Sequence, residues 1–183
     1  PRFPLALYSR AWVLPRVGRG AEKQRDFDEA IRCAPEFAEP YIFRGSDHLS
    51  AGRTAEALAD FDRLIAMGIH LAPAYNGRAG VKLRLLKDYD GTIADASEAI
   101  RLKPEGYHIP WAYRAEARLG KEDWDGAIAD ADRVMEIHRE PSERYKHLAL
   151  RGRARVGKGD RAGAEADFRA AGKAGEPFLN KLR

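Results

Sequence analysis

One stretch of the sequence has the residue spacing of a phosphate-binding loop. Gly152, Gly157 and Lys158 fit the pattern G-x-x-x-x-G-K, in which backbone N–H groups and a lysine hold phosphate oxygens. The serine or threonine that would coordinate magnesium is absent, because Gly159 follows the lysine. The stretch also falls on a predicted helix and turn, whereas a phosphate loop joins a strand to a helix. We therefore predict that it binds no nucleotide.

The other side chains that could do chemistry are scattered along the chain. The histidines have no cysteines or carboxylates at the spacing of a metal site: His48, His70, His108, His138 and His147. Glu122 and Asp123 fall in a predicted exposed turn, where solvation explains two adjacent carboxylates. Cys33 has no histidine nearby in the sequence and is predicted to be a small apolar filler. We predict a protein that is not an enzyme and has no cofactor or metal.

The composition allows a continuous core together with a large solvated surface. Hydrophobic residues make up 44% of the 183 residues and charged residues 33%. The formal net charge of +4 is too small by itself to indicate nucleic-acid binding, which usually requires a dense stripe of lysine and arginine. The single cysteine excludes an intramolecular disulfide and leaves the redox compartment open.

Targeting and membrane signals are also weak. No run approaches the roughly 20 apolar residues that span a bilayer. The opening segment, residues 1–8, is apolar but contains two prolines and no long hydrophobic core, so it does not have the pattern of a secretory signal. We expect a cytoplasmic protein without membrane association.

A helical pattern is clearest between Pro110 and Met135. Apolar or small side chains recur there at intervals that place them on one face of an α-helix: Trp124, Ala127, Ile128, Ala131, Val134 and Met135. Trp111, Ala115 and Leu119 share a face of a preceding helix, and Gly120 marks the turn between the two. The stretch is therefore predicted to be a helix, a tight turn and a second helix.

This pair of helices recurs along the chain. Subtracting residue numbers gives spacings of 34, 35, 35 and 37 between the aspartates of the second helices: Asp26, Asp60, Asp95, Asp130 and Asp167. Small residues keep the same period in the first helices: Ala11, Gly45, Gly80, Ala115 and Gly152. Small residues also recur in the second helices: Ala57, Thr92, Ala127 and Ala164. A period in this range with two helices per unit is typical of a helical solenoid.

At these residues the pattern resembles the tetratricopeptide repeat (TPR). The unit at 108–141 matches through Trp111, Ala115, Trp124 and Ala127, that at 73–107 through Gly80, Tyr89, Ala99 and Pro104, and that at 38–72 through Tyr41, Gly45, Ala57 and Phe61. The resemblance covers nearly the whole chain. It implies an all-α fold, a right-handed superhelical solenoid of stacked antiparallel helix pairs. Departures from the pattern are Pro15, Thr92, Ala96, Ala131 and the extra residues at 142–144.

We predict one solenoid domain over residues 1–183. Its units are placed at about 4–37, 38–72, 73–107, 108–141 and 145–178, followed by a short C-terminal cap. The first unit is degenerate, because Pro15 must end its first helix early. In the last unit Gly163, Gly172 and Gly175 are expected to weaken the second helix by about 1 kcal/mol each relative to alanine.

The repeated charges suggest ion pairs between helices. Arg44, Arg114 and Arg151 each precede the small residue of a first helix, and an aspartate recurs in every second helix. We predict partly buried pairs that fix the stacking register, with Arg114 bound to Asp95 and Arg151 to Asp130.

The resemblance also implies where a partner would bind. Such solenoids present a concave groove lined by the first helices, and the family's groove positions fall on Ser46, Leu49, Gly77, Val81, Arg84, Ala112, Glu116, Leu119, Lys146, Ala149 and Arg153. The neighbouring residues Phe43, Arg78 and Tyr113 could also reach it. Arg84, Lys146 and Arg153 favour an acidic segment, although Glu116 sits among them. Of the lysine and asparagine positions that grip a chaperone C-terminus in some members, only Lys146 is present, so that partner is rejected.

Three classes of function follow from these observations. The first is a non-catalytic scaffold, a monomer or weak homodimer, that binds a protein or peptide segment. The second is a regulatory or oligomerisation module of a larger protein, which stays open because the sequence begins at Pro1 without a methionine. The third is RNA binding through the basic tract at 144–161, for which a solvated helix face is the simpler explanation.

The small residues generate a test of the packing. Ala127→Leu should overpack the crossing between the two helices of its unit and destabilise the protein by about 1 to 3 kcal/mol. Thermal unfolding of the variant measures this effect. A melting temperature equal to that of the parent would show that Ala127 does not lie at the crossing.

Overall fold

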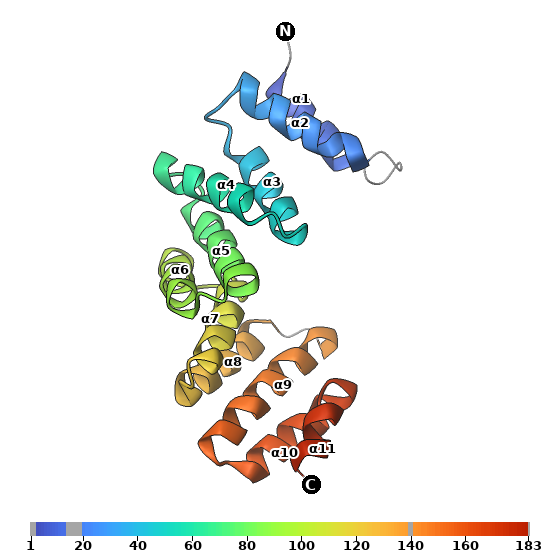
Figure 1. The fold of residues 1–183 in the computed structure, drawn as a ribbon, viewed down its shortest axis with the longest axis vertical. Coiled ribbons are helices and arrows are strands. Elements are labelled where there is room, and N and C mark those ends of the chain that lie inside the picture. The colour runs from blue at the N-terminus through green and yellow to red at the C-terminus, as the bar shows by residue number, and fades with distance from the viewer. Residues whose placement is uncertain (1–2, 14–19, 139–140, 183) are drawn as a thin grey trace. The chain divides into compact units, whose positions relative to one another are not determined.

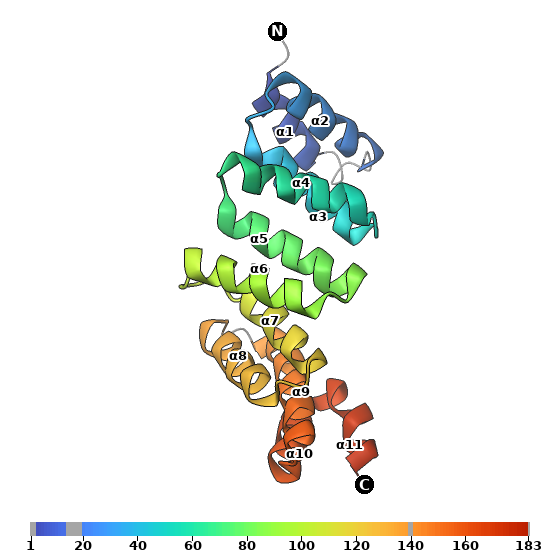
Figure 2. The same ribbon diagram turned by 60° about the vertical axis from the view of Figure 1, so that its left-hand side comes forward.

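The computed structural model describes residues 3–13, 20–138 and 141–182 of the chain. All regular elements in these residues are helices, in agreement with the predicted all-α class (Figure 1). The chain forms two compact units, Pro1–Val81 and Lys82–Arg183. Within each unit, helices that follow one another in the sequence pack side by side, as Figures 1 and 2 show.

The first unit is built from helical hairpins. Its elements are α1 (Pro4–Val13), α2 (Gly20–Cys33), α3 (Ala38–Ser50), α4 (Thr54–Met67) and α5 (Leu71–Val81). α1 packs on α2 and α3 on α4, while α2 also contacts α3 and α4 contacts α5. α4 ends at Gly68, which adopts a left-handed φ of 70° that glycine accepts without strain.

The second unit follows the same plan. It begins with the π-helical turn η2 (Lys82–Leu86), followed by α6 (Tyr89–Leu102), α7 (Ile109–Gly120), α8 (Trp124–Ile137), α9 (Pro141–Lys158), α10 (Arg161–Ala170), the 3-10 turn η3 (Gly172–Ala174) and α11 (Glu176–Leu182). α7 pairs with α8 and α9 with α10, and α11 lies against α10.

Several sequence predictions can be compared with these bounds. α9 begins at Pro141, a residue suited to the first turn of a helix, so residues 142–144 lengthen this helix and start it four residues before the predicted 145. The predicted break at Pro15 lies outside the described residues. Cys33 is exposed at the end of α2, beyond Ala30, the last buried residue of this helix, so its prediction as an apolar filler is wrong.

The small residues lie where the two helices of a hairpin cross. Ala11, Ala57, Ala127 and Ala164 have no exposed surface. A Cβ added at Gly152 would come within 2.5 Å of the Phe168 ring, so this crossing admits only a hydrogen. The close crossings predicted from the small residues are therefore present in the structure.

α6, α8 and α10 each begin with the same kind of N-terminal cap. Asp88, Asp123 and Asp160 each accept a hydrogen bond from the backbone N–H of the glycine three residues later, at 2.9–3.0 Å. A Cβ at Gly163 would come within 2.1 Å of the Asp160 carboxylate. Gly163 therefore leaves room for the Asp160 carboxylate that caps α10. This is a second effect of the glycine, besides the predicted weakening of the helix.

A bidentate ion pair joins the two helices in four hairpins, and we call it the hairpin ion pair. An arginine next to the small residue binds the aspartate 16 positions later through Nε and Nη2: Arg10 with Asp26, Arg44 with Asp60, Arg114 with Asp130, and Arg151 with Asp167. The donor–acceptor distances are 2.5–3.0 Å. The aspartates are buried, with at most 4% of their surface exposed.

The predicted partners of these arginines were therefore wrong. Arg114 binds Asp130 and not Asp95, and Arg151 binds Asp167 and not Asp130. The reason is helix geometry. The buried aspartate faces its own hairpin, whereas a residue two positions later is turned by about 200° and faces the next one.

The residue two positions after the buried aspartate of the preceding hairpin accepts a hydrogen bond from the arginine's third nitrogen, Nη1. Nη1 of Arg44 donates to Asp28 at 2.7 Å, and Nη1 of Arg114 donates to the hydroxyl of Ser97 at 2.9 Å. Arg151 likewise donates to Asp132. One guanidinium thus connects three helices: the two of its own hairpin and the one before it.

One repeat lacks the arginine of the hairpin ion pair, because Ala79 precedes its small residue, Gly80. Lys82 lies 2.8 Å from the buried carboxylate of Asp95, and Arg78 donates to Asp62 at 2.7 Å. Asp95 therefore has a cationic partner although no arginine precedes Gly80. The partner is Lys82 of η2.

The hairpin ion pair gives a prediction for stability. Asp130→Ala would leave Arg114 and Arg118 without the carboxylate that both contact. We expect a loss of about 3 kcal/mol, at the low end for breaking a buried pair, because both guanidinium groups can still reach water. The midpoint of urea unfolding measures this loss.

Asp125→Ala is the matched control. Asp125 also pairs with a cation, Lys158, but 76% of its side chain is exposed. We expect a cost below about 1 kcal/mol. Equal effects of the two substitutions would contradict the role assigned to the buried pair.

Candidate functional site

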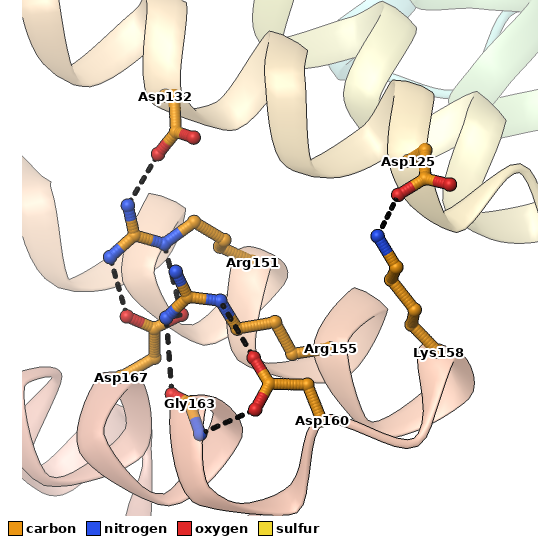
Figure 3. Close-up of polar contacts among 8 residues, drawn as sticks. All are labelled: Asp125, Asp132, Arg151, Arg155, Lys158, Asp160, Gly163 and Asp167. Atoms are coloured by element: carbon orange, nitrogen blue, oxygen red, sulfur yellow. Dashed lines mark hydrogen bonds and ion pairs between the residues drawn. The ribbon is translucent and has the colours of Figure 1, made fainter.

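Residues 152–158, which have the spacing of a phosphate loop, lie at the end of α9, which packs against α8. Gly157 lies against the ring of Trp124, where an added Cβ would approach to 2.6 Å, and Lys158 pairs with Asp125 (Figure 3). The same contacts recur one repeat earlier, where Gly120 lies against Tyr89 and Lys121 pairs with Asp90. A glycine and a lysine at the end of one helix therefore hold an aromatic residue and an aspartate at the start of another.

Three cations of the basic tract at 144–161, namely Arg151, Arg155 and Lys158, are paired with aspartates. Arg151 and Arg155 both bind Asp167, and Arg155 also lies 3.7 Å from Asp160 (Figure 3). Hydrogen bonds to Asp167 raise the pKa of Arg151 against the opposing effect of burial. These cations hold α9 to α8 and α10.

A hollow of about 610 Å³ opens on the second unit. α7 contributes Ile109, Ala112, Tyr113 and Glu116, and α9 contributes Lys146, Ala149, Leu150 and Arg153. Both sets follow the spacing i, i+3, i+4, i+7, which is one face of a helix. Arg84 comes from η2, and Ala174 and Phe178 come from η3 and α11. We call this space the first hollow.

Two arginines of the first hollow are held over aromatic rings. The guanidinium carbon of Arg84 lies 5.2 Å from the ring centre of Tyr113, and that of Arg153 lies 5.7 Å from that of Phe178. Within the part of the chain that the structure describes, neither arginine forms an ion pair. Such cation–π contacts orient a guanidinium without neutralising its charge.

Burial raises the pKa of two tyrosines in this part of the second unit. Burial raises the pKa of Tyr113, the charge of Arg84 lowers it, and that of Glu116 raises it. Burial, and then the neighbouring Tyr113, raise the pKa of Tyr107 to about 12. Both phenols therefore keep their proton to a higher pH than an exposed tyrosine does.

Seven of the fourteen predicted groove residues line the first hollow: Arg84, Ala112, Tyr113, Glu116, Lys146, Ala149 and Arg153. Leu119 lies further along α7, and the other six belong to the first unit. Val81 is fully buried, and the Ser46 hydroxyl donates to the Ile42 carbonyl. Phe43 packs against Trp12 with ring centres 4.6 Å apart, and Arg78 is bound to Asp62.

Sequence reasoning missed several residues of the first hollow: His108, Ile109, Tyr145, His147, Leu150, Ala174 and Phe178. The i, i+4 spacing of Lys146 and Leu150 was a usable signal, since it continues the face already chosen on α9. Ala174 and Phe178 gave no such signal, because they belong to the turn and short helix after the last repeat.

The first hollow brings cationic and apolar side chains together. It combines three cationic side chains, Arg84, Lys146 and Arg153, with one carboxylate, Glu116, and apolar or aromatic walls. Across residues 3–13, 20–138 and 141–182, no group of three histidine, cysteine or acidic residues is placed to hold a metal ion. No helix in those ranges is long and apolar enough to cross a membrane.

Comparisons with known proteins establish the fold. No protein-family model matches the sequence, and no curated protein matches it significantly. A solved structure of MamA residues 41 to the end, from Desulfovibrio magneticus RS-1, is 18% identical, with a TM-score of 0.77 over 98% of this chain and 96% of that one. YrrB, described as a TPR protein with an unusual peptide-binding site, is 15% identical, with a TM-score of 0.71 over 92% and 84%.

A third structure gives the same result. TTC0263, a thermophilic TPR protein in Thermus thermophilus, is 16% identical, with a TM-score of 0.69 over 98% of this chain and 95% of that one. The expected all-α tetratricopeptide solenoid fold is therefore confirmed.

The neutral tyrosines generate a prediction for pH dependence. In the unfolded chain a tyrosine has a pKa of about 10, whereas folding raises the pKa of Tyr107 to about 12. Between these values the unfolded state releases a proton that the folded state keeps, so stability falls as the pH rises. Tyr107→Phe should make this fall shallower. Urea midpoints measured from about pH 9 to about pH 12 test it, and an unchanged slope would contradict the burial of this phenol.

Proposed function

We propose that this chain, which has the tetratricopeptide fold, is a non-catalytic scaffold that binds an acidic segment of a partner protein in the first hollow. The proposal goes beyond the fold and rests on the side chains of the second unit. The partner segment would lie across the faces of α7 and α9, with carboxylates toward the arginines and apolar side chains toward the walls.

The observation that carries this proposal is that one set of arginines is paired with carboxylates and another set is not. Arg114 and Arg151 are bound to buried aspartates. Arg84 and Arg153 border the hollow, each lies over an aromatic ring, and neither forms an ion pair with a carboxylate among the described residues. An acidic segment would supply the missing anions, and charge complementarity of this kind speeds association and selects partners.

The apolar walls supply the rest of the recognition. Ile109 is 37% exposed and Tyr145 39% exposed, although both are large and apolar or aromatic. A cavity of about 610 Å³ lies within the usual size of ligand sites and can take several side chains. Aromatic residues and arginine are also the residue types that most often dominate binding energy at protein interfaces.

RNA binding through the basic tract is less well supported. Arg151, Arg155 and Lys158 are held by aspartates of the same unit, so their charges are not free to release counterions from a phosphate backbone. The regulatory-module alternative shares the same surface, and would use the first hollow to bind a segment of its own larger protein.

Charge reversal tests the proposal. The probe is a fluorescein-labelled twelve-residue peptide of glutamate and serine with one central leucine, and fluorescence anisotropy measures its binding. Arg84→Glu combined with Arg153→Glu should weaken binding at least about tenfold, equal to about 1.4 kcal/mol, because both reversed charges face the probe. Unchanged affinity would refute binding in the first hollow.

Arg25→Glu combined with Arg63→Glu is the matched control. It makes the same change in net charge at two exposed residues of α2 and α4, in the first unit. The control should retain the affinity of the parent. An equal loss in both double variants would mean that only the net charge matters, and would also refute the site.

A further inference from the structure

A second hollow lies on the same unit. It has a volume of about 390 Å³, and most of its wall is apolar or aromatic: Leu119, Trp124, Val156, Phe168 and Phe178. Two cations border it, Arg153 and Lys181. Val156 is 44% exposed, so a large aliphatic side chain is left in contact with water at its edge.

The structure shows how this space is formed. Gly157 has no side chain, and the ring of Trp124 lies directly on its backbone. On the other side Phe178 of α11 stacks on Phe168 of α10, with ring centres 5.2 Å apart and planes inclined by 19°. The short helix α11 therefore stands as a wall beside α9.

The second hollow continues the line of the first along the same two helix faces. On α9 the lining residues Val156 and Gly157 follow Arg153 at i+3 and i+4, and on α7 Leu119 follows Glu116 at i+3. Arg153 and Phe178 line both hollows. The two hollows therefore adjoin each other at these two side chains.

The spacing of the two hollows follows from helix geometry. The α9 residues that line the first hollow are centred at about residue 149, and those that line the second at about residue 156. With a rise of 1.5 Å per residue, the two centres are about 10 Å apart along the helix axis. An extended peptide advances about 3.3 Å per residue. Two side chains about three residues apart on such a peptide would reach both hollows.

We propose that the second hollow is a subsite for a large apolar side chain of the bound segment, about three residues from the side chain in the first hollow. Arg153, between the two, pairs with an acidic residue of the segment. The inference rests on the proposed function and adds to it the sequence class of the partner: two large apolar residues separated by acidic ones.

The charges of the second hollow support this occupant over a basic one. Neither Arg153 nor Lys181 forms an ion pair with any residue that the structure describes. No acidic side chain lines this hollow. A segment with lysine or arginine beside its apolar residue would bring like charges together, whereas glutamate or aspartate there would be attracted.

The experiment compares peptides with one and two leucines. The probes are the one-leucine peptide described above and versions with a second leucine two, three, four or five residues away on either side. In the parent protein the best two-leucine probe should bind at least about fivefold more tightly, with the optimum at three or four residues. If no spacing improves binding more than twofold, the subsite is refuted while the proposed function stands. If no probe binds, the proposed function itself fails.

A substitution locates the gain in the second hollow. Val156→Glu should reduce the ratio of the one-leucine to the two-leucine dissociation constants to about 1, because it places a carboxylate in the apolar wall. Ala166→Glu, at an exposed alanine of α10 that lines neither hollow, makes the same charge change and should keep the ratio of the parent. A ratio that survives in Val156→Glu would refute the subsite.

Tryptophan emission gives a readout that does not depend on Val156. The chain has three tryptophans, and Trp12→Phe with Trp111→Phe leaves Trp124 as the only one. The two-leucine probe should shift its emission to shorter wavelength, because leucine would displace water from the ring, and the one-leucine probe should not. Identical spectra with both probes would contradict occupation of the second hollow.

Discussion

The structure depends on a buried carboxylate in each hairpin that is always matched by a cation. Isolated charges are costly to bury, and the cost is recovered only when hydrogen bonds satisfy the carboxylate with good geometry. The arginine provides two parallel N–H groups from a planar fork, which fixes both the distance and the angle between the helices. The small residue beside each arginine lets the helices approach closely enough for this contact. Charge pairing and close packing are therefore one feature of the hairpin.

The same requirement separates the cations of the second unit into two groups. Arginines that point into a hairpin are bound to aspartates, and lysines at helix ends are bound to the aspartates of a neighbouring helix. Arg84 and Arg153 are instead oriented by aromatic rings, which leave their charge available. A mildly basic chain can therefore present a local positive surface although most of its charges are internally balanced.

The sequence was sufficient for the helices, the period and the crossings, because these depend on local spacing. The period of the aspartates and the small residues led to the all-α solenoid fold. It could not assign Arg114 to Asp130 instead of Asp95, since both lie at similar separations and only the rotation of the helix distinguishes them.

The candidate site was harder to predict than the fold. α7 and α9 followed the face implied by the repeat, and supplied six of the predicted residues that line the first hollow. The wall formed by Ala174 and Phe178 comes from a segment outside the repeat, which the period does not describe. Cys33 failed for a related reason, since apolar character alone does not decide which face of a helix end is covered.

The pairing of each arginine with its own hairpin also has an evolutionary consequence. If the aspartates were satisfied by the preceding hairpin, deleting or duplicating one unit would leave a charge stranded in the interior. Because Arg114 and Asp130 travel together within one stretch of about 17 residues, a unit can be copied or lost by recombination with its electrostatic requirement already met. Arrays of different length can then arise from the same module without a compensating change elsewhere.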